Sequence, residues 1–332
     1  MAKEIVLSGI RPTGFLHLGN YFGAVQNWVR MQQDYDCYFC VVDWHSLTTH
    51  PDTKELRNNV HRLLGELLAS GLDPDQSVIY VQSDVREIAE LYLYLNMLAY
   101  KGELEKTPTF KDKVRQHPEN VNAGLLAYPV LQAADILIHG AVKIPVGKDQ
   151  EQHIEMTRNL AERFNQRYSA SLPLPYAFNY GESLTKILSL DGSGKMSKSL
   201  NQMATIYLAD EDDLIRKKIM KAKTDSGPTE KAMPKPAYIE NLFALMRLVS
   251  NNDVTARFET DYDNCSIRYG DMKKQLAEDM AAFIKPIREK AKAIENDKAY
   301  LSAVIKKGEE KARANAGKTI KLVREAMKFN YV

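Results

Sequence analysis

The sequence predicts an α/β fold followed by a helical region, on two observations. Over the first 170 residues, short apolar runs alternate with longer amphipathic runs. Such alternation is typical of a parallel sheet with helices on both of its faces. From about residue 210 to the C-terminus, the spacing of apolar residues is that of helices alone.

The expected strands are short and rich in β-branched and aromatic residues. The run CYFCVV at 37–42 is continuous, as expected for a strand buried on both faces. We expect Asp84 to cap one helix, Pro129 to kink another, and no strand after residue 170. This order of elements predicts a Rossmann-like sheet, with strands at 4–8, 37–42, 77–81 and 142–146 and helices at 18–33, 53–70, 84–100, 122–139 and 149–168.

Composition excludes several classes of protein. The chain has 332 residues, enough for about two domains, and its 45 Lys and Arg against 43 Asp and Glu exclude a polycation and an acidic tail. No window holds about 20 apolar residues, and the first residues lack a signal-peptide core. Three cysteines are too few for a disulfide framework. We therefore expect no membrane span and a cytoplasmic location.

Positive charge is concentrated in two helical stretches. Residues 214–235 hold seven Lys and Arg against two acidic residues, and residues 287–332 hold twelve against six. One interpretation is a surface that binds a polyanion. The other is a set of solvated helix faces with ion pairs along each helix.

The first motif follows the first expected strand. Residues 8–20 read SGIRPTGFLHLGN, which is a turn followed by a helix start near His17. Ligands of open α/β sheets bind beyond the carboxyl ends of the strands, where a helix N-terminus favours an anion. His17 and Arg11 can donate hydrogen bonds to a phosphate, Gly19 leaves room beside the helix, and Asn20 shares a face with His17. The alternative is a turn glycine and an ordinary first-turn histidine.

The second motif is GKMSKS at 194–199, on a glycine-rich loop. Lys195 and Lys198 are mobile charges that can close on a polyphosphate and stabilise charge developing on a leaving pyrophosphate. Reactions at phosphorus need such positioning and electrostatic stabilisation more than a protein nucleophile. The alternative is a flexible surface loop.

Together the two motifs resemble those of class I aminoacyl-tRNA synthetases, and the chain as a whole resembles the bacterial-type tryptophanyl-tRNA synthetases. The resemblance is close over residues 4–199 and looser in the helical part. It rests on SGIRPTGFLHLGNYFGA, VVDWHSLTTH, GLDPDQSVIYVQSDV, GLLAYPVLQAADILI, IPVGKDQEQHIEMTRNLAERFN and KMSKS.

The resemblance implies an ATP-dependent ligase that forms tryptophanyl-adenylate and then charges tRNA(Trp). It also implies Mg²⁺ accompanying ATP, a homodimer, and closure of the lysine loop and helical domain over ATP. The corresponding units are a catalytic domain at 1–190, the KMSKS loop at 191–200, an anticodon-binding helical domain at 201–294, and a C-terminal helix at 295–332 that packs back on the catalytic domain.

An amino-acid pocket is suggested by one helix face. Tyr128, Gln132 and Asp135 are spaced i, i+4 and i+7 among apolar neighbours, and a carboxylate there needs a donor. The donor could be a protein group, but the resemblance implies the indole N–H for Asp135 and the ammonium group for Tyr128 and Gln150. The full set implied for tryptophan is Leu7, Val42, His45, Tyr128, Gln132, Asp135, Ile144, Val146 and Gln150.

The resemblance also implies an ATP site whose catalytic residues are His17, Lys195 and Lys198. Asp149 would accept from the ribose hydroxyls, although it could equally cap a helix together with Gln152. The full set implied for ATP is Arg11, Pro12, Thr13, Gly19, Asn20, Gly147, Lys148, Asp149, Ile187, Lys195, Met196, Ser197, Lys198 and Ser199.

Some residues depart from the family pattern. Asn20 replaces a histidine, which favours the tryptophan enzymes, whereas Arg11 and Gln132 vary within the family. Cys265 alone cannot build the four-cysteine iron–sulfur cluster of some members, so we expect no protein-ligated metal. Cys37 and Cys40 have C-x-x-C spacing, but a buried strand makes them core residues.

Three alternative functions are also compatible with parts of the sequence. A tyrosyl-tRNA synthetase shares the fold and both motifs, although VVDWHSLTTH and PVLQAADIL favour tryptophan. A small-molecule nucleotidyltransferase can use a similar phosphate-binding helix, but it would lack a large basic helical domain. A non-enzymatic paralogue that binds RNA is disfavoured because both phosphate motifs are intact.

Overall fold

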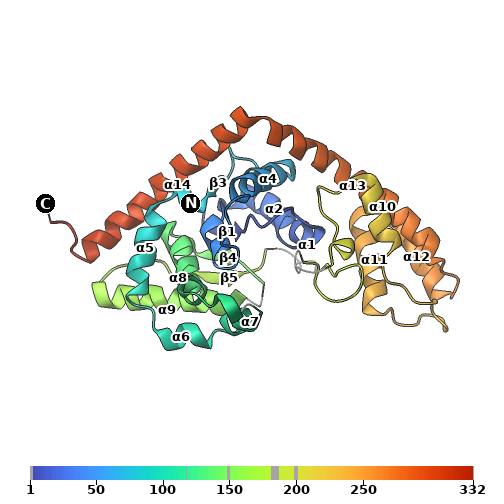
Figure 1. Cartoon of the computed structure of the whole chain (residues 1–332), viewed down its shortest axis with the longest axis horizontal. Coiled ribbons are helices and arrows are strands. Elements are labelled where there is room, and N and C mark those ends of the chain that lie inside the picture. The colour runs from blue at the N-terminus through green and yellow to red at the C-terminus, as the bar shows by residue number, and fades with distance from the viewer. Residues whose placement is uncertain (1–2, 117, 148–149, 181–186, 198–200, 332) are drawn as a thin grey trace.

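Five parallel strands form the centre of the protein, seen here in a computed structural model that describes residues 3–116, 118–147, 150–180, 187–197 and 201–331. The sheet order is β3-β2-β1-β4-β5 (Figure 1). Val6 pairs with Cys37 on one side and Lys143 on the other, so β1 is central. The strands are β1 (Ile5–Ile10), β2 (Asp36–Val41), β3 (Val78–Val81), β4 (Lys143–Pro145) and β5 (Tyr176–Phe178).

Helices surround this sheet and form most of the region that follows residue 210. The first long helix is continuous through α1 (Leu18–Asn20), a π-helical segment η1 (Tyr21–Val25) and α2 (Gln26–Asp34). The others are α3 (Asp43–Leu47), α4 (Leu56–Ala69), η2 (Gln82–Asp84), α5 (Glu87–Asn96), α6 (Lys101–Lys106), α7 (Pro108–Gln116), η3 (Pro118–Asn120), α8 (Ala123–Ile138), α9 (Glu151–Tyr168), η5 (Gln202–Ala204), α10 (Asp212–Met220), α11 (Ala237–Val249), α12 (Asn252–Asp263), α13 (Tyr269–Asn296) and α14 (Lys298–Ala326).

Two hydrophobic cores lie on opposite faces of the sheet. Successive residues of β2 alternate between them: Phe39 packs with the core beneath α2 and α4, whereas Tyr38 and Cys40 pack with the core beneath α5, α8 and α9. Alternation of this kind follows from the two-residue period of a strand. The predicted fold class, a Rossmann-like sheet followed by a helical region, is confirmed.

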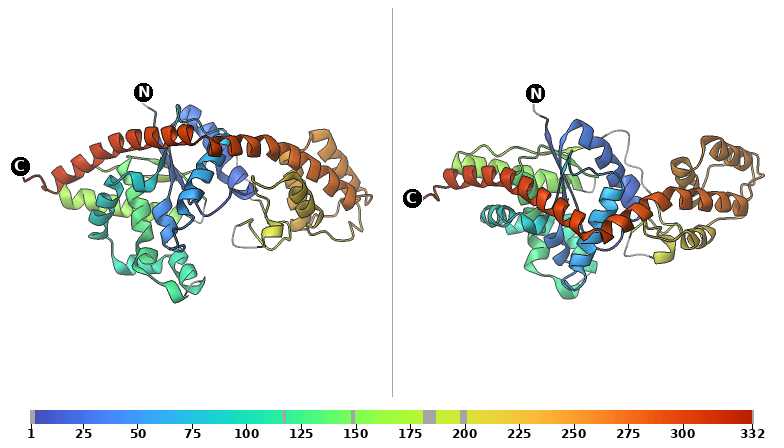
Figure 2. Two further views of the ribbon diagram at one scale, coloured as in Figure 1. Left: turned by 45° about the horizontal axis from the view of Figure 1, so that its top comes forward. Right: turned by 90° about the horizontal axis from the view of Figure 1, so that it is seen from above.

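The helical region returns to the sheet through its last two helices. The long helix α13 packs against α4, α10 and α11, and α14 then crosses β3 and α5 (Figure 2). At the crossing the backbones are in close contact, because a Cβ on Gly308 would lie 1.8 Å from the carbonyl oxygen of Ile79. Arg324 adds an ion pair with Glu90 on α5 at 2.6 Å.

Two expectations about local structure were wrong, and two further features were not predicted. A fifth strand follows residue 170, and its three residues, which come directly after a turn with two prolines, are too few to give a strand pattern. Asp84 does not cap a helix: it ends η2, and α5 begins after Arg86. The first long helix contains a π-helical segment, and the short helices α6 and α7 were not expected.

The two neighbouring cysteines are core residues, as predicted. Cys37 and Cys40 are 0% and 1% exposed on β2. Burial raises the pKa of the Cys37 thiol to about 12 and also raises the pKa of Cys40, so both stay protonated. None of the described helices combines the length and the apolar character that crossing a membrane requires.

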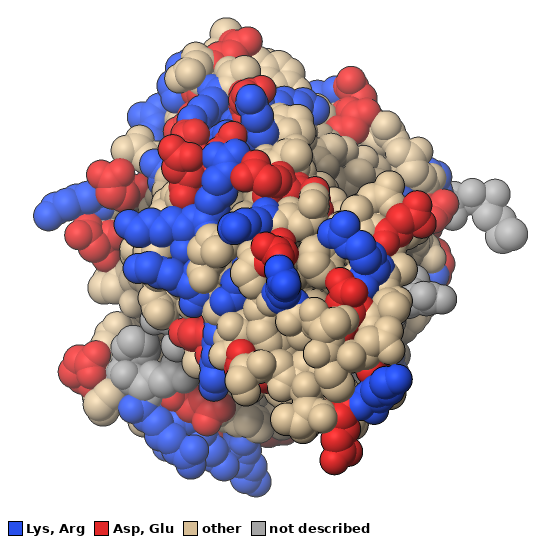
Figure 3. All heavy atoms as spheres, turned by 90° about the vertical axis from the view of Figure 1, so that its right-hand side faces the viewer, with Lys and Arg blue, Asp and Glu red and all other residues tan. Residues whose placement is uncertain are grey.

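Many of the basic residues in the helical region form ion pairs. Basic and acidic side chains are interspersed on this face of the molecule (Figure 3). Arg216 pairs with Glu278 at 2.8 Å, and Arg288 pairs with Asp212 at 2.7 Å. These contacts support the ion-pair interpretation for part of the two basic stretches, and binding of a polyanion there stays a prediction.

Candidate active site

The turn after β1 leads into a helix that is capped by His17. The backbone N–H of Asn20 donates to Nδ1 of His17 at 3.3 Å, and the backbone N–H of His17 donates to Oδ1 of Asn20 at 3.4 Å. Since Nδ1 accepts a hydrogen bond, the neutral ring carries its proton on Nε2. This tautomer lets His17 donate to an anion, and Asn20 fixes it.

The two predicted phosphate motifs meet in the structure. A Cβ placed on Gly19 would lie 3.5 Å from the Cβ of Met196, so the described part of the GKMSKS motif passes directly beside the first helix. The segment after the loop also pairs with the segment before the helix. Leu18 donates its N–H to the carbonyl of Ile206 at 3.0 Å, and Leu208 donates to Leu16 at 2.8 Å (residues 204–208 are called the strap below).

The described part of the lysine loop is held at its base. Met196 donates its N–H to the carbonyl of Ile187 at 3.0 Å, and the carbonyl of Ser197 accepts from Oγ1 of Thr205 at 3.1 Å. Lys195 is exposed at the edge of the cavity described next. Lys198 and Ser199 lie outside the described residues.

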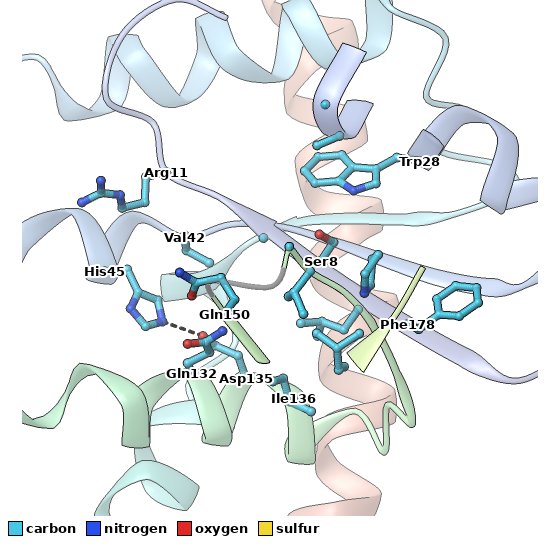
Figure 4. A pocket seen from close by; sticks show the side chains of 18 of the residues that line it. Ser8, Arg11, Trp28, Val42, His45, Gln132, Asp135, Ile136, Gln150 and Phe178 are labelled. Atoms are coloured by element: carbon cyan, nitrogen blue, oxygen red, sulfur yellow. Dashed lines mark hydrogen bonds and ion pairs between the residues drawn. The ribbon is translucent and has the colours of Figure 1, made fainter. Parts of the chain in front are cut away.

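A cavity of about 550 Å³ lies at the carboxyl ends of the strands (Figure 4). The chain reverses its direction of winding between β1 and β4, where open α/β sheets bind ligands. Lys195 lies at the same cavity. All nine residues predicted to bind tryptophan line it, namely Leu7, Val42, His45, Tyr128, Gln132, Asp135, Ile144, Val146 and Gln150.

Asp135 is the buried acid of this cavity, at 3% exposure. His45 approaches it with Nε2 2.8 Å from Oδ2, as Figure 4 shows. Gln82 donates from Nε2 to both carboxylate oxygens, at 2.8 and 2.9 Å. These donors offset the cost of burying a carboxylate, which therefore remains a hydrogen-bond acceptor inside an apolar site.

Three further polar side chains form a hydrogen-bonded chain at the cavity wall. The Tyr128 hydroxyl lies 2.9 Å from Nε2 of His153, and Nδ1 of His153 lies 2.9 Å from Oε1 of Gln150. Burial raises the pKa of Tyr128 to about 12, so its hydroxyl stays protonated. The histidine thus holds together the two residues that were predicted to bind an ammonium group.

Comparison with known proteins fits this geometry. The family model described as tRNA synthetases class I (W and Y) matches residues 2–285. The chain belongs to this family. A tryptophan–tRNA ligase of Porphyromonas gingivalis is 55% identical over 327 residues, covering 98% of this chain and 99% of the relative. One of Clostridium acetobutylicum is 40% identical over 321 residues, covering 96% and 95%.

Solved structures of the family also superpose on this synthetase. The crystal structure of tryptophanyl-tRNA synthetase from Campylobacter jejuni, complexed with ADP and tryptophan, gives a TM-score of 0.87. It is 33% identical in sequence and covers 98% of this chain and 99% of its own. The resemblance to the tryptophanyl-tRNA synthetases is confirmed.

Among the residues that the structure describes, three cationic side chains line the cavity of the synthetase. Arg11 follows β1 and donates from Nη1 to Oγ1 of Thr49 at 3.1 Å, and Lys113 reaches the cavity from α7. Burial lowers the pKa of Arg11; burial and the nearby Arg11 charge lower that of Lys113. With Lys195, these groups give the synthetase a positive rim that suits a polyphosphate.

Of the residues predicted to bind ATP, only some line the cavity. Arg11, Gly147 and Lys195 line the cavity, whereas Ile187 and Met196 are each 1% exposed and pack in a hydrophobic core. Pro12, Thr13, Gly19, Asn20 and Ser197 are described but are not among the cavity-lining residues. Lys148 and Asp149 lie outside the described residues, and the N-cap of α9 is Gln150.

Several cavity residues were not predicted. The π-helical segment and α2 contribute a cluster that includes Trp28, α7 contributes Thr109 and Lys113, and the end of β5 contributes Phe178, Asn179 and Tyr180. Gln82 and His153 are not among the described lining residues, but each forms a hydrogen bond with a side chain that lines the cavity. The sequence could have indicated Gln82, because it is the first polar residue after the buried strand β3. His45 lies in the corresponding place, shortly after the neighbouring strand β2.

Proposed function

We propose that this protein is a tryptophan–tRNA ligase, which activates L-tryptophan with ATP and esterifies the terminal adenosine of tRNA(Trp). The observation that carries the proposal is Asp135, a buried acceptor among apolar walls in a cavity that Lys195 also reaches. The indole ring of tryptophan is apolar except for one N–H donor. Asp135 matches that donor, and the walls formed by Val42 and Ile144 match the ring.

The first step joins tryptophan to the α-phosphate. A tryptophan carboxylate oxygen attacks the α-phosphorus of ATP, a P–O bond forms, and the bond to the bridging oxygen breaks. Pyrophosphate leaves with the electron pair, and tryptophanyl-adenylate remains bound. Nε2 of His17 and the ammonium groups of Lys195 and Lys198 stabilise the charge that develops on the phosphates. The step uses no covalent enzyme intermediate.

The second step transfers the acyl group to tRNA. The 2′-hydroxyl of the terminal adenosine attacks the adenylate carbonyl, the ester forms, and AMP leaves. We assign the tRNA backbone to the helical domain at 201–294, where several lysines are exposed, for example Lys217 and Lys231. Contacts between lysines and phosphates would make tRNA affinity fall with added salt.

Magnesium enters with the nucleotide in this scheme. Mg²⁺ prefers oxygen ligands and keeps several waters, so the phosphates of ATP supply its main ligands. Among the described residues, no group of three or more His, Cys, Asp or Glu side chains could hold a metal ion. We propose MgATP as the substrate and the cytoplasm as the location of the enzyme.

A homodimer is part of the proposal. Leu93, Met97 and Tyr100, on and just after α5, are 52%, 70% and 60% exposed, which is unusual for large apolar side chains. Beside α5 lies an apolar hollow to which Tyr128 and Thr48 contribute, and both residues also line the substrate cavity. A second copy seated on this surface would border the substrate site of the first.

Amino-acid-dependent pyrophosphate exchange tests the proposed function. Purified protein is incubated with ATP, labelled pyrophosphate and either tryptophan or tyrosine. Exchange that requires tryptophan, followed by charging of tRNA(Trp), supports the proposal. Faster exchange with tyrosine would assign a tyrosyl enzyme, and adenylate formation that no amino acid stimulates would leave a nucleotidyltransferase or a binding protein.

A further inference from the structure

Gln82 lies directly behind the acidic group of the substrate cavity. It has no exposed surface, and it is not among the described residues that line the cavity. One amide nitrogen contacts both oxygens of Asp135, at 2.8 Å for Oδ1 and 2.9 Å for Oδ2. Since a carboxylate can only accept, this atom is the donating nitrogen and not the amide oxygen.

The hydrogen bonds leave the two carboxylate oxygens unequal. Oδ2 accepts from Gln82 and from Nε2 of His45, which uses both of its lone pairs. Oδ1 accepts from Gln82, and its second lone pair can receive a further donor. The contact with His45 therefore leaves Oδ1 of Asp135 as the oxygen for a ligand N–H, and the Gln82 amide holds the carboxylate in this orientation.

Gln82 itself is fixed by the turns that follow two neighbouring strands. Its Oε1 accepts from the backbone N–H of His45 at 3.4 Å. In the opposite direction, Oδ1 of Asp43 accepts from the backbone N–H of Ser83 at 3.1 Å. These two bonds join the turn after β2 to the turn after β3. Rotation of the Gln82 amide would break the bond that its Oε1 accepts from His45 and the bonds that its Nε2 donates to Asp135.

We infer that Gln82 is a positioning residue that makes the site select an amino acid whose ring carries an N–H donor. The inference rests on the proposed function, and it assigns to Gln82 a part in substrate selection beyond packing. Without the amide, Asp135 keeps His45 as its one side-chain partner among the described residues and can turn about its side-chain bonds. A ring N–H then loses its prepared acceptor, whereas a ring without a donor loses nothing.

The substrate pair that isolates this effect is tryptophan and β-(1-benzothiophen-3-yl)alanine, in which sulfur replaces the indole N–H. The test variant is Gln82→Met, which keeps the length of the side chain but cannot donate. The matched control is Gln32→Met, because Gln32 is also buried, at 4% exposure, and its hydrogen bonds to Gly71, Asp73 and Ser77 involve no residue that lines the described cavity. Pyrophosphate exchange gives kcat/KM for each substrate.

We expect Gln82→Met to lower kcat/KM for tryptophan at least about 10-fold, since bonds to a charged group are strong. The kcat/KM for the benzothiophene analogue should change less than about 3-fold, so the preference for tryptophan falls at least about 3-fold. Gln32→Met should leave that preference unchanged. Equal losses for both substrates in Gln82→Met would show a structural role only and would overturn the inference.

A second variant decides the question if Gln82→Met does not fold. Gln82→Glu keeps the shape of the side chain but places a second carboxyl group against that of Asp135. The two carboxyl groups share a proton more readily at low pH. One shared proton restores a donor to Asp135. As the pH is lowered from 8 to 6, the KM for tryptophan of this variant should therefore fall relative to the KM of the unaltered enzyme. The titratable groups around the pair are His45 and Asp43 on α3, Cys40 on β2, Tyr80 on β3, Asp84 on η2 and Tyr128 on α8.

The proposed function and the inference about Gln82 fail in different ways. If the unaltered enzyme shows no exchange with tryptophan, the proposed function is wrong. If it exchanges with tryptophan but the preference survives Gln82→Met, or if Gln82→Glu follows the pH profile of the unaltered enzyme, the inference about Gln82 is wrong and the function stands.

Discussion

The ammonium nitrogen of Lys218 lies 2.6 Å from Oδ2 of Asp210, and both side chains are buried. The same nitrogen donates to the carbonyl of Thr205 at 2.7 Å, in the strap that pairs with the first helix. Lys218 belongs to one of the two basic stretches, yet it is inaccessible to a polyanion. It anchors the helical region to the residues that support the lysine loop.

Lys218→Met should destabilise the protein by roughly 3–5 kcal/mol, because it leaves Asp210 buried and unpaired. The matched control is Lys217→Met, one residue away on α10 but exposed, and it should change stability by less than about 0.5 kcal/mol. Urea unfolding measures both. Similar stability for the two variants would mean that the buried pair contributes little.

Gly308→Ala should also destabilise the protein, by about 3 kcal/mol or more, because its Cβ would collide with the backbone of Ile79. Gly317 is on the same helix, and a Cβ there would meet no atom of another segment within 4 Å. Gly317→Ala should therefore stabilise the protein by roughly 0.5–1 kcal/mol through helix propensity. Thermal unfolding compares them, and a neutral Gly308→Ala would contradict the close crossing.

Stability should fall in mild acid because of His139. This ring is 1% exposed, and burial lowers its pKa to about 4. In the unfolded chain its pKa is about 6.5, so the unfolded state binds more protons between these values and stability is lost as the pH drops. From pH 7 to pH 5 the loss is about 2 kcal/mol. His139→Gln should remove that part of the pH dependence, and an unchanged slope would contradict the low pKa.

Asp135→Ala should impair tryptophan use far more than ATP use. The variant removes the acceptor that we propose for the indole N–H, so KM for tryptophan in pyrophosphate exchange should rise roughly 100-fold or more. The KM for ATP should change less than about 3-fold. Comparable losses for both substrates would indicate that Asp135 acts through its bonds to His45 and Gln82 as a structural residue.

Much of the fold could be predicted because its signals are local. Apolar runs predicted four of the five strands to within about two residues, and the i, i+4, i+7 spacing predicted that Tyr128, Gln132 and Asp135 share one face. Both motifs were expected at one site, and the contact between Gly19 and Met196 brings them together.

The remainder depends on contacts between distant segments. The strand β5 is three residues long and exists because β4 offers it a pairing edge. The bonds of Asp135 to Gln82 and His45 join three segments across 90 residues of sequence, so composition and periodicity carry no trace of them. Likewise, the spacing of charges could not tell the buried Lys218 from the exposed Lys217.

In the proposed mechanism ATP reacts between the first helix and the lysine loop, so the decisive measurement is single-turnover formation of tryptophanyl-adenylate by Lys195→Ala. Loss of one preorganised donor should slow this step roughly 100-fold or more, while Lys217→Ala, on the exposed face of α10, keeps the original rate. An unchanged rate in Lys195→Ala would show that the lysine loop does not act on ATP in this step.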